Sequence, residues 1–195
     1  MCVRPSPLPE DSTAKHVASA PIDRQTGGMA YELAQVNVGR LVAPLTSPQL
    51  KDFVDALDPV NALADAAPGL VWRMQTEDGN ATAIRAFEWD AGTSAGVIVN
   101  MSTWRSVEDL AAYVYSGEHR AVLKRRREWF ERMPEAFTAL WWVPEGHRPG
   151  TDEAEDRIRH LRAHGPTPYA FTFRETFPPG GAVPEPGQAD WFCKA

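Results

Sequence analysis

The chain has 195 residues, of which 43% are hydrophobic, and a formal net charge of −6. A chain of this length and composition can bury a substantial core as one domain without metal or disulfide support. Nucleic acids and anionic membranes select basic surfaces, so an acidic protein offers them no long-range attraction. We therefore expect a small molecule, and neither nucleic acid nor membrane, as the binding partner.

The two cysteines and the hydropathy of the chain bear on its location. Cys2 and Cys193 lie near the two ends and form no CxxC motif, which indicates neither a disulfide framework nor a zinc site. No apolar run approaches the roughly 20 residues that span a bilayer, and the first residues lack the apolar segment of a signal peptide. We therefore expect a cytoplasmic protein. His, Asp and Glu show no metal-type spacing either, so we expect no metal site.

The two ends of the chain differ in composition from its middle. Residues 1–28 contain four prolines, end in Gly27-Gly28 and show no periodic apolar pattern, as is typical of a disordered extension. Residues 175–195 form a Pro/Gly-rich tail. These boundaries leave residues 29–174 as the predicted domain.

Within the domain, apolar periodicity and turn residues predict ten elements. In chain order they are a strand over 33–38, a helix over 47–67, strands over 70–75, 84–89 and 97–104, helices over 106–115 and 119–133, a strand over 138–143, a helix over 152–163 and a strand over 169–173. This order predicts an α+β fold with the ferredoxin-like split βαβ as its core. In that fold helices cover one face of an antiparallel sheet, and the bare apolar face needs a partner. We therefore expect a homodimer that closes two sheets into a barrel.

The helix predicted over 119–133 is the most informative segment. A wheel at 100° per residue collects its apolar side chains in one stripe, made of Val122, Trp129, Phe130 and Met133. His119 and Arg126 fall inside the stripe, so we expect His119 to transfer a proton and Arg126 to face a ligand anion or developing negative charge. The alternatives are a hydrogen-bonded histidine at the helix start and an internal salt bridge. Lys124, Arg125 and Arg127 point away from the stripe and are expected to be an ordinary solvated face.

The strand over 97–104 supplies the third catalytic candidate. Two-residue alternation puts Ile98, Asn100, Ser102 and Trp104 on one face. An amide and an indole on the same face can hold a phenol or carbonyl oxygen over an aromatic wall. The alternative is a polar row that faces solvent or a second subunit.

The substrate-binding candidates are mainly aromatic. The chain has seven tryptophans, and such side chains either fill a core or line a pocket for an aromatic ligand. The residues expected to contact substrate are Trp72, Arg73, Trp104, Trp129 and Trp142. No GxGxxG follows a strand, and GxxxxGK and HExxH motifs are absent from the sequence, so nucleotide and zinc-hydrolase functions lack support.

Four segments carry a resemblance to a known family. They are MAYELAQVNVGRLVAPLTSP, DALDPVNALADAAPGLVWRMQTEDGNAT, VNMSTWRSVEDLAAYVYSGEHRAVLKRRREWF and WWVPEGHRPGTDEAEDRIRHLRAHGPTPYAFTFR. Together they resemble bacterial proteins of the DUF3291 family over residues 29–174. That family is similar in fold to the dimeric α/β-barrel superfamily, which includes antibiotic-biosynthesis monooxygenases and heme-handling relatives. The resemblance thus implies a ferredoxin-like domain that forms a homodimer.

The same resemblance implies chemistry only by analogy within the superfamily. Some of its cofactor-free monooxygenases bind a phenolic substrate with an asparagine and a tryptophan four residues apart, which Asn100 and Trp104 resemble. Heme-binding relatives use an axial histidine, for which His119 is the candidate. The expectation is a cofactor-independent enzyme, of monooxygenase, cyclase or isomerase type, acting on a small aromatic or polyketide-like molecule in secondary metabolism. The alternatives are a heme-binding enzyme or carrier and a non-catalytic small-molecule-binding dimer.

Overall fold

The computed structural model describes residues 30–115 and 117–181. The predicted disordered extension, residues 1–28, lies outside the described residues, as does the tail from residue 182 onward. The strands are β1 (Tyr31–Arg40), β2 (Leu70–Arg73), β3 (Val97–Trp104) and β4 (Thr138–Pro144). The helices are α1 (Lys51–Asp65), α2 (Val107–Val114), α3 (Gly117–Arg125) and α4 (Thr151–His164), with 3-10 turns η1 (Pro48–Leu50), η2 (Glu88–Asp90) and η3 (Arg126–Glu128).

The four strands form an antiparallel sheet in the order β2-β3-β1-β4, which confirms the α+β class. β1 lies inside the sheet and pairs with both β3 and β4. Val36 and Val38 of β1 are buried, whereas Gln35 and Asn37 beside them are half-buried. Since successive side chains point to opposite faces, β1 presents an apolar row on one face and a partly polar row on the other.

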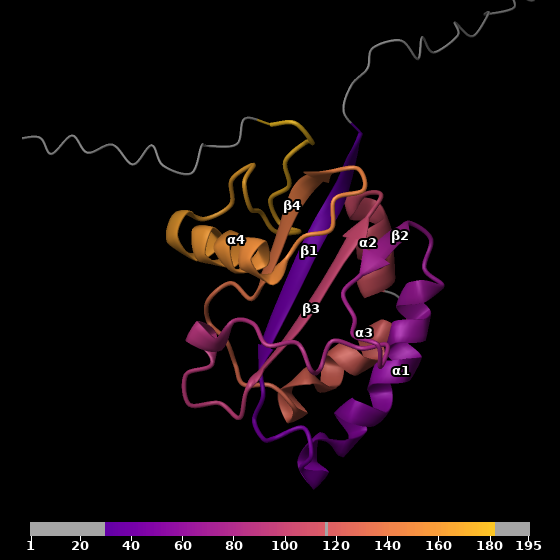
Figure 1. Cartoon of the computed structure of the whole chain (residues 1–195), viewed down its shortest axis with the longest axis vertical. Helices are drawn as coiled ribbons and strands as arrows, with labels where there is room; N and C mark the ends of the chain where they lie inside the picture. The colour runs from indigo at the N-terminus through magenta and orange to yellow at the C-terminus, as the bar shows by residue number, and fades with distance from the viewer. Residues whose placement is uncertain (1–29, 116, 182–195) are drawn as a thin grey trace, which may run out of the picture.

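Helices pack against both faces of the sheet (Figure 1). α4 covers the apolar row with its own buried stripe, made of Ala154, Ile158 and Leu161. α1, α2 and α3 lie on the other face, where Leu110 of α2 packs with Trp104. The prediction that helices cover only one face is therefore wrong, because the stripe of α4 finds its burial on the row expected to be bare. The bare apolar face that suggested a homodimer is therefore absent from the described fold, because α4 covers it.

Two of the predicted strands are wrong. Residues 84–89 belong to a long loop in which Phe87 has a left-handed backbone, with φ of 58°, that interrupts an extended chain. Residues 169–173 form no strand, although Phe171 exchanges two backbone hydrogen bonds with Leu140 of β4, at 2.9 and 2.8 Å. The folded region also continues past residue 174, since Trp142 Nε1 donates to the carbonyl of Phe177 at 2.6 Å.

The predicted helix over 119–133 is shorter than expected. α3 ends at Arg125 and the turn η3 follows. The chain then meets the end of β1, where the backbone N–H of Glu131 donates to the carbonyl of Arg40 at 2.9 Å. The apolar stripe predicted for one continuous helix is therefore divided between α3 and the segment after it, which pairs with a distant strand.

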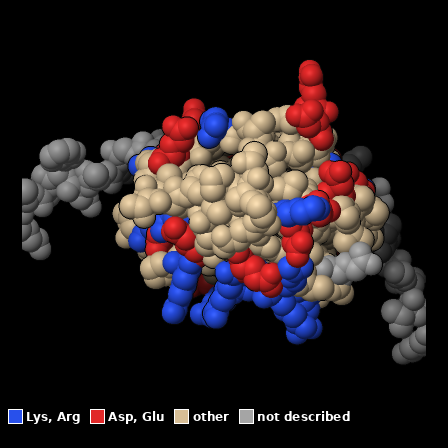
Figure 2. Space-filling view, turned by 90° about the horizontal axis from the view of Figure 1, so that it is seen from below, with Lys and Arg blue, Asp and Glu red and all other residues tan. Residues whose placement is uncertain are grey.

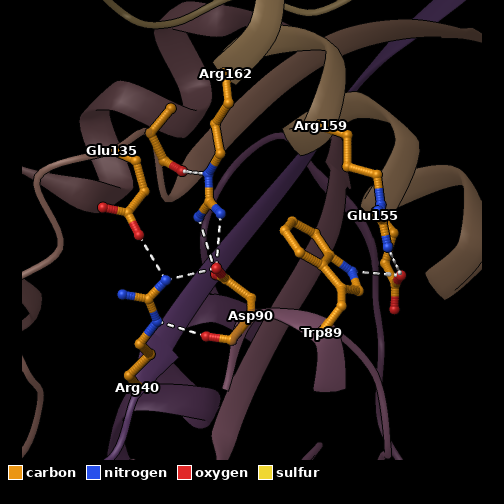
Figure 3. A network of polar contacts seen from close by, with 8 residues as sticks. Arg40, Trp89, Asp90, Glu135, Glu155, Arg159 and Arg162 are labelled. Carbon is orange, nitrogen blue, oxygen red and sulfur yellow. Dashed lines mark hydrogen bonds and ion pairs between the residues drawn. The ribbon is translucent and has the colours of Figure 1, made fainter. Parts of the chain in front are cut away.

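A buried carboxylate fixes the long loop between β2 and β3 (Figure 3). Asp90 is only 4% exposed, and its carboxylate accepts hydrogen bonds from Arg40 at 2.6 Å and from Arg162 at 2.7 and 2.9 Å. Arg40 ends β1 and Arg162 lies on α4, so the network joins the loop to the central strand and to the helix. Burial by itself raises the pKa of Asp90, but the hydrogen bonds from Arg162 and Arg40 outweigh it and hold the pKa below its ordinary value.

We predict that Asp90→Asn lowers the free energy of unfolding at pH 7 by about 3 kcal/mol, because Arg162 loses its carboxylate partner and Arg40 keeps only Glu135. The depressed pKa means that the contribution of Asp90 is present above its ordinary pKa of 3.8 and is lost as the pH falls through the lower value of the folded protein. Urea unfolding of both proteins from pH 7 down to about pH 3 should therefore show a difference that shrinks at the acid end. Asp78→Asn, at an exposed turn of the same loop, is the control and should change stability by less than about 0.5 kcal/mol. Equal losses in the two variants would contradict this role of Asp90.

Candidate functional site

A pocket of about 420 Å³ lies between the sheet and the three helices α1, α2 and α3. Its size falls in the range of small-molecule sites. The floor is a set of polar side chains from three neighbouring strands: Gln35, Asn37, Asn100, Ser102 and Thr138. The strand register brings them together, because Asn37 stands opposite Asn100 on one side and Thr138 on the other. The polar row of β3 thus faces a pocket under helices.

The side-chain amides on the pocket floor differ in whether they already form hydrogen bonds within the protein. Asn37 Nδ2 donates to Thr138 Oγ1 at 2.8 Å, and Gln35 Nε2 donates to the backbone carbonyl of Asn100 at 3.4 Å. The side-chain amide of Asn100 makes no hydrogen bond to any residue that the structure describes, and Asn100 is exposed. Asn100 can therefore offer both a donor and an acceptor to a ligand.

Aromatic rings close one end of the pocket. Trp104 is buried and stacks on Tyr113 with ring centroids 5.2 Å apart, and Tyr113 lies 4.6 Å from the ring of His119. Trp104 Nε1 donates to Ser102 Oγ at 2.8 Å, so its indole N–H is not available to a ligand. Burial raises the pKa of Tyr113 to about 12, which keeps its hydroxyl protonated at neutral pH.

His119 lines this end of the pocket as a neutral base. The carbonyl of Val114 can only accept, so His119 Nδ1 carries the hydrogen of their 2.9 Å hydrogen bond. Burial lowers the pKa of His119 and outweighs the opposing effect of that carbonyl. The neutral ring therefore has its lone pair on Nε2, which makes no hydrogen bond within the described part of the chain. His119 is thus hydrogen-bonded at a helix end, as one of the predicted alternatives stated, and it also lines the pocket.

The opposite end of the pocket is closed by a second aromatic group. Trp129 packs with Ile98 at the start of β3. Phe130 lies against Gly39 of β1, where an added Cβ would come within 2.7 Å of the ring, so only a glycine admits Phe130 here. Since His119 lies near Trp104 and Trp129 near Ile98, α3 and η3 follow β3 in the reverse direction.

Arg126 lies at the mouth of the pocket. Because α3 ends one residue earlier, Arg126 is exposed, and its guanidinium donates to the backbone carbonyl of Leu123 at 3.2 Å. It forms no ion pair with a described residue, so the alternative of an internal salt bridge is wrong for this part of the chain. Arg127 and Arg132 line the pocket beside it. Arg127 is exposed, as expected, but it also lines the pocket, because it lies in the 3-10 turn η3 and not on a continuous helix.

Three other predicted contact residues have structural partners. Arg73 lines the pocket, but its guanidinium donates to both carboxylate oxygens of Asp65, at 2.6 and 2.9 Å. Trp72 points to the opposite face and packs into the core under α4. Trp142 is on the pocket face but lies outside the pocket, because the C-terminal segment covers it with Phe171 and Phe177. Of the predicted site residues, the structure thus brings together Asn100, Trp104, His119, Arg126, Trp129 and Arg73.

The sequence analysis missed several residues of the pocket. Gln35 and Asn37 could have been found, because the alternation of the first strand places both on the face of Leu33. Tyr113 lies one turn after Leu110 on the same predicted helix, but nothing local indicated that it separates Trp104 from His119. Arg132 gave no signal, because its position follows from the path of the chain after η3.

Two structural features bear on the predicted absences. Within residues 30–115 and 117–181, no group of three or more His, Cys, Asp or Glu side chains is arranged to hold a metal ion. None of the described helices is both long and apolar enough to cross a membrane.

Comparisons with known proteins define the family. A search of curated proteins found no similar sequence. Among solved structures, the crystal structure of a protein of unknown function from Nitrosomonas europaea is similar at 11% identity and a TM-score of 0.38, over 63% of this chain and 97% of that chain. A likeness this low carries no argument. Residues 32–185 match the family described as a domain of unknown function, DUF3291. Because that match covers most of the chain and all elements around the pocket, the chain belongs to the DUF3291 family.

Proposed function

We propose that the pocket binds a small aromatic or polyketide-like molecule of secondary metabolism and that the chain transforms it without metal or nucleotide. The reaction is of monooxygenase, cyclase or isomerase type. The observation that carries the proposal is the neutral imidazole of His119, which lines an aromatic pocket and whose Nε2 has no hydrogen-bond partner among the described residues. A general base in such a place suits proton abstraction from an apolar substrate.

The position of His119 supports its role as the base. An imidazole with a lowered pKa stays unprotonated at neutral pH and can take a proton from a phenol or from a carbon beside a carbonyl. Val114 ends α2, so the imidazolium that forms would lie at the negative end of a helix dipole, which stabilises it. The resulting phenolate or enolate is the common intermediate for isomerisation, for ring closure onto a second carbonyl and for reaction with dioxygen.

His119 and Asn100 lie at different places along the pocket and would contact different parts of the substrate. Asn100 and Trp104 are four residues apart on β3, which corresponds to about 13 Å. His119 lies at the Trp104 end, so His119 and Asn100 contact different atoms of one ligand. A molecule with two or three fused rings fits this arrangement. One oxygen of the molecule would be hydrogen-bonded to Asn100, and an acidic proton elsewhere on the molecule would lie near His119.

The topology supports the finer fold assignment that the sequence suggested. The order β2-β3-β1-β4 and the antiparallel pairing of all neighbours are those of a ferredoxin-like split βαβ, with α1 as the first crossover and α2 with α3 as the second. α4 is then an addition on the face that a dimeric α/β barrel would use. The homodimer stays a prediction, and its interface would have to lie away from the surface that α4 covers.

We predict that His119→Gln lowers the rate of anthrone enolisation by about 10²–10⁴-fold, since the glutamine lacks a basic nitrogen. Anthrone is a three-ring probe whose enolisation changes its absorbance, and an oxygen electrode detects any oxygenation that follows. Because burial lowers the pKa of His119, the acid limb of the wild-type pH–rate profile should lie below pH 6.5.

His160→Gln is the matched control, because His160 lies on α4, outside the pocket. Its rate should equal that of the wild type. If wild-type protein binds anthrone but enolises it no faster than buffer, the enzyme proposal fails and the non-catalytic binding site predicted as an alternative gains support.

A second prediction concerns the floor of the pocket. Asn100→Ala should weaken the binding of 1-naphthalenemethanol by about 3- to 10-fold, which corresponds to one neutral hydrogen bond. Quenching of tryptophan fluorescence measures the Kd, since Trp104 and Trp129 both line the pocket. Gln49→Ala removes an exposed amide outside the pocket and should leave the Kd unchanged. An unchanged Kd in Asn100→Ala would show that the amide does not contact the ligand.

One observation favours heme binding as a second candidate function. Metal-ligating histidines commonly donate their other ring N–H to a carbonyl, as His119 Nδ1 does to Val114. If this function is correct, stoichiometric hemin should give a shifted Soret band that disappears in His119→Ala and persists in His160→Ala. Absence of a spectral change with wild-type protein would exclude it.

A further inference from the structure

Three arginines line the pocket near the end that is remote from His119: Arg126, Arg127 and Arg132. All three are exposed, and none forms an ion pair with a described residue. They follow α3 along the chain, close to the point where β1 ends. Figure 2 looks onto this end of the molecule and shows Lys and Arg side chains gathered along one edge.

Two arginines close to these three in the structure differ from them because each has a carboxylate partner: Arg73, which also lines the pocket, and Arg125 at the end of α3. Arg125 pairs with Asp52 and with Glu128, both at 2.7 Å. Arg73 is held by Asp65. Arg73 and Arg125 are thus neutralised by carboxylates, whereas Arg126, Arg127 and Arg132 have no carboxylate partner among the residues that the structure describes.

The mouth of the pocket keeps a net positive charge. Glu131 is the one carboxylate among the described residues that line the pocket, against the three unpaired arginines. The chain as a whole has a net charge of −6, so it does not attract anions at long range. An anion that binds here must therefore do so through local contacts, and guanidinium groups offer the forked geometry that suits carboxylate and phosphate oxygens.

We propose that the ligand of the pocket carries an oxyanion, either a carboxylate or a phosphate, which Arg126, Arg127 and Arg132 hold at the mouth. This rests on the proposed function and names the substrate class within it. The aromatic body lies along the floor toward Trp104, and the oxyanion end lies close to Asn100 and away from His119. The anchor fixes which end of the substrate enters first, so it selects the atom that meets His119.

Three matched probes test this proposal by quenching of tryptophan fluorescence at pH 7: 1-naphthoate, 1-naphthyl phosphate and the uncharged 1-naphthalenemethanol. At low salt at least one anionic probe should bind wild-type protein about 10-fold or more tightly than the uncharged probe, as expected for charge-assisted hydrogen bonds. The preference should fall as salt is raised, because exposed charges are screened. The better anionic probe identifies the carboxylate or the phosphate as the natural group.

The triple variant Arg126→Gln/Arg127→Gln/Arg132→Gln should lose about 10-fold or more in affinity for the anionic probe and less than about 2-fold for the uncharged one. Lys124→Gln is the control, since Lys124 is a cation on the same helix that does not line the pocket. Far-ultraviolet circular dichroism and thermal unfolding verify that the variants fold, and the salt series on wild-type protein tests the proposal without any variant.

The outcomes separate this inference from the proposed function. Equal binding of charged and uncharged probes by wild-type protein overturns the oxyanion anchor and leaves the pocket intact. Equal loss of affinity in the triple variant and in Lys124→Gln overturns the assignment to the three arginines. Absence of binding by any of the probes overturns both proposals.

Discussion

The pairing of β1 with β3 and β4 is the constraint on which the fold and the pocket both depend. It places Asn37 between Asn100 and Thr138, so polar side chains from three strands meet on one face. A slip of one residue would turn these amides into the core under α4 and bring valines to the pocket. The cost would be buried polar groups without partners as well as apolar side chains removed from the core. The register that stabilises the domain is therefore the one that builds the site.

The two faces of the sheet are covered in different ways because they present different side chains. Against the apolar row, α4 packs its buried stripe into one hydrophobic core. Opposite the polar row, the helices rest on aromatic contacts at the two ends, with Tyr113 over Trp104 at one and Phe130 beside Gly39 at the other. The space between these supports remains open, because amide side chains give a helix no apolar surface to close upon.

Charge is handled in two contrasting ways in this domain. Asp90 is almost completely buried, and hydrogen bonds from Arg40 and Arg162 compensate for the loss of water around it. At the pocket mouth, the arginines that have no carboxylate partner among the described residues stay exposed, and solvent hydrates them. The buried network keeps the long loop and α4 in place, whereas the exposed arginines remain available to a ligand.

The sequence by itself determined the α+β class, most of the helices and strands, and the shared strand face of Asn100 and Trp104. These follow from periodicity, which is a property of neighbouring residues. It also placed His119 at the start of an amphipathic segment. Only the tertiary structure decided that α4 covers the second face, that α3 stops before Arg126 and that Ser102 occupies the indole N–H of Trp104. The first two of these depend on contacts between residues far apart in the chain, and the third on a side-chain rotamer, so no local pattern states them.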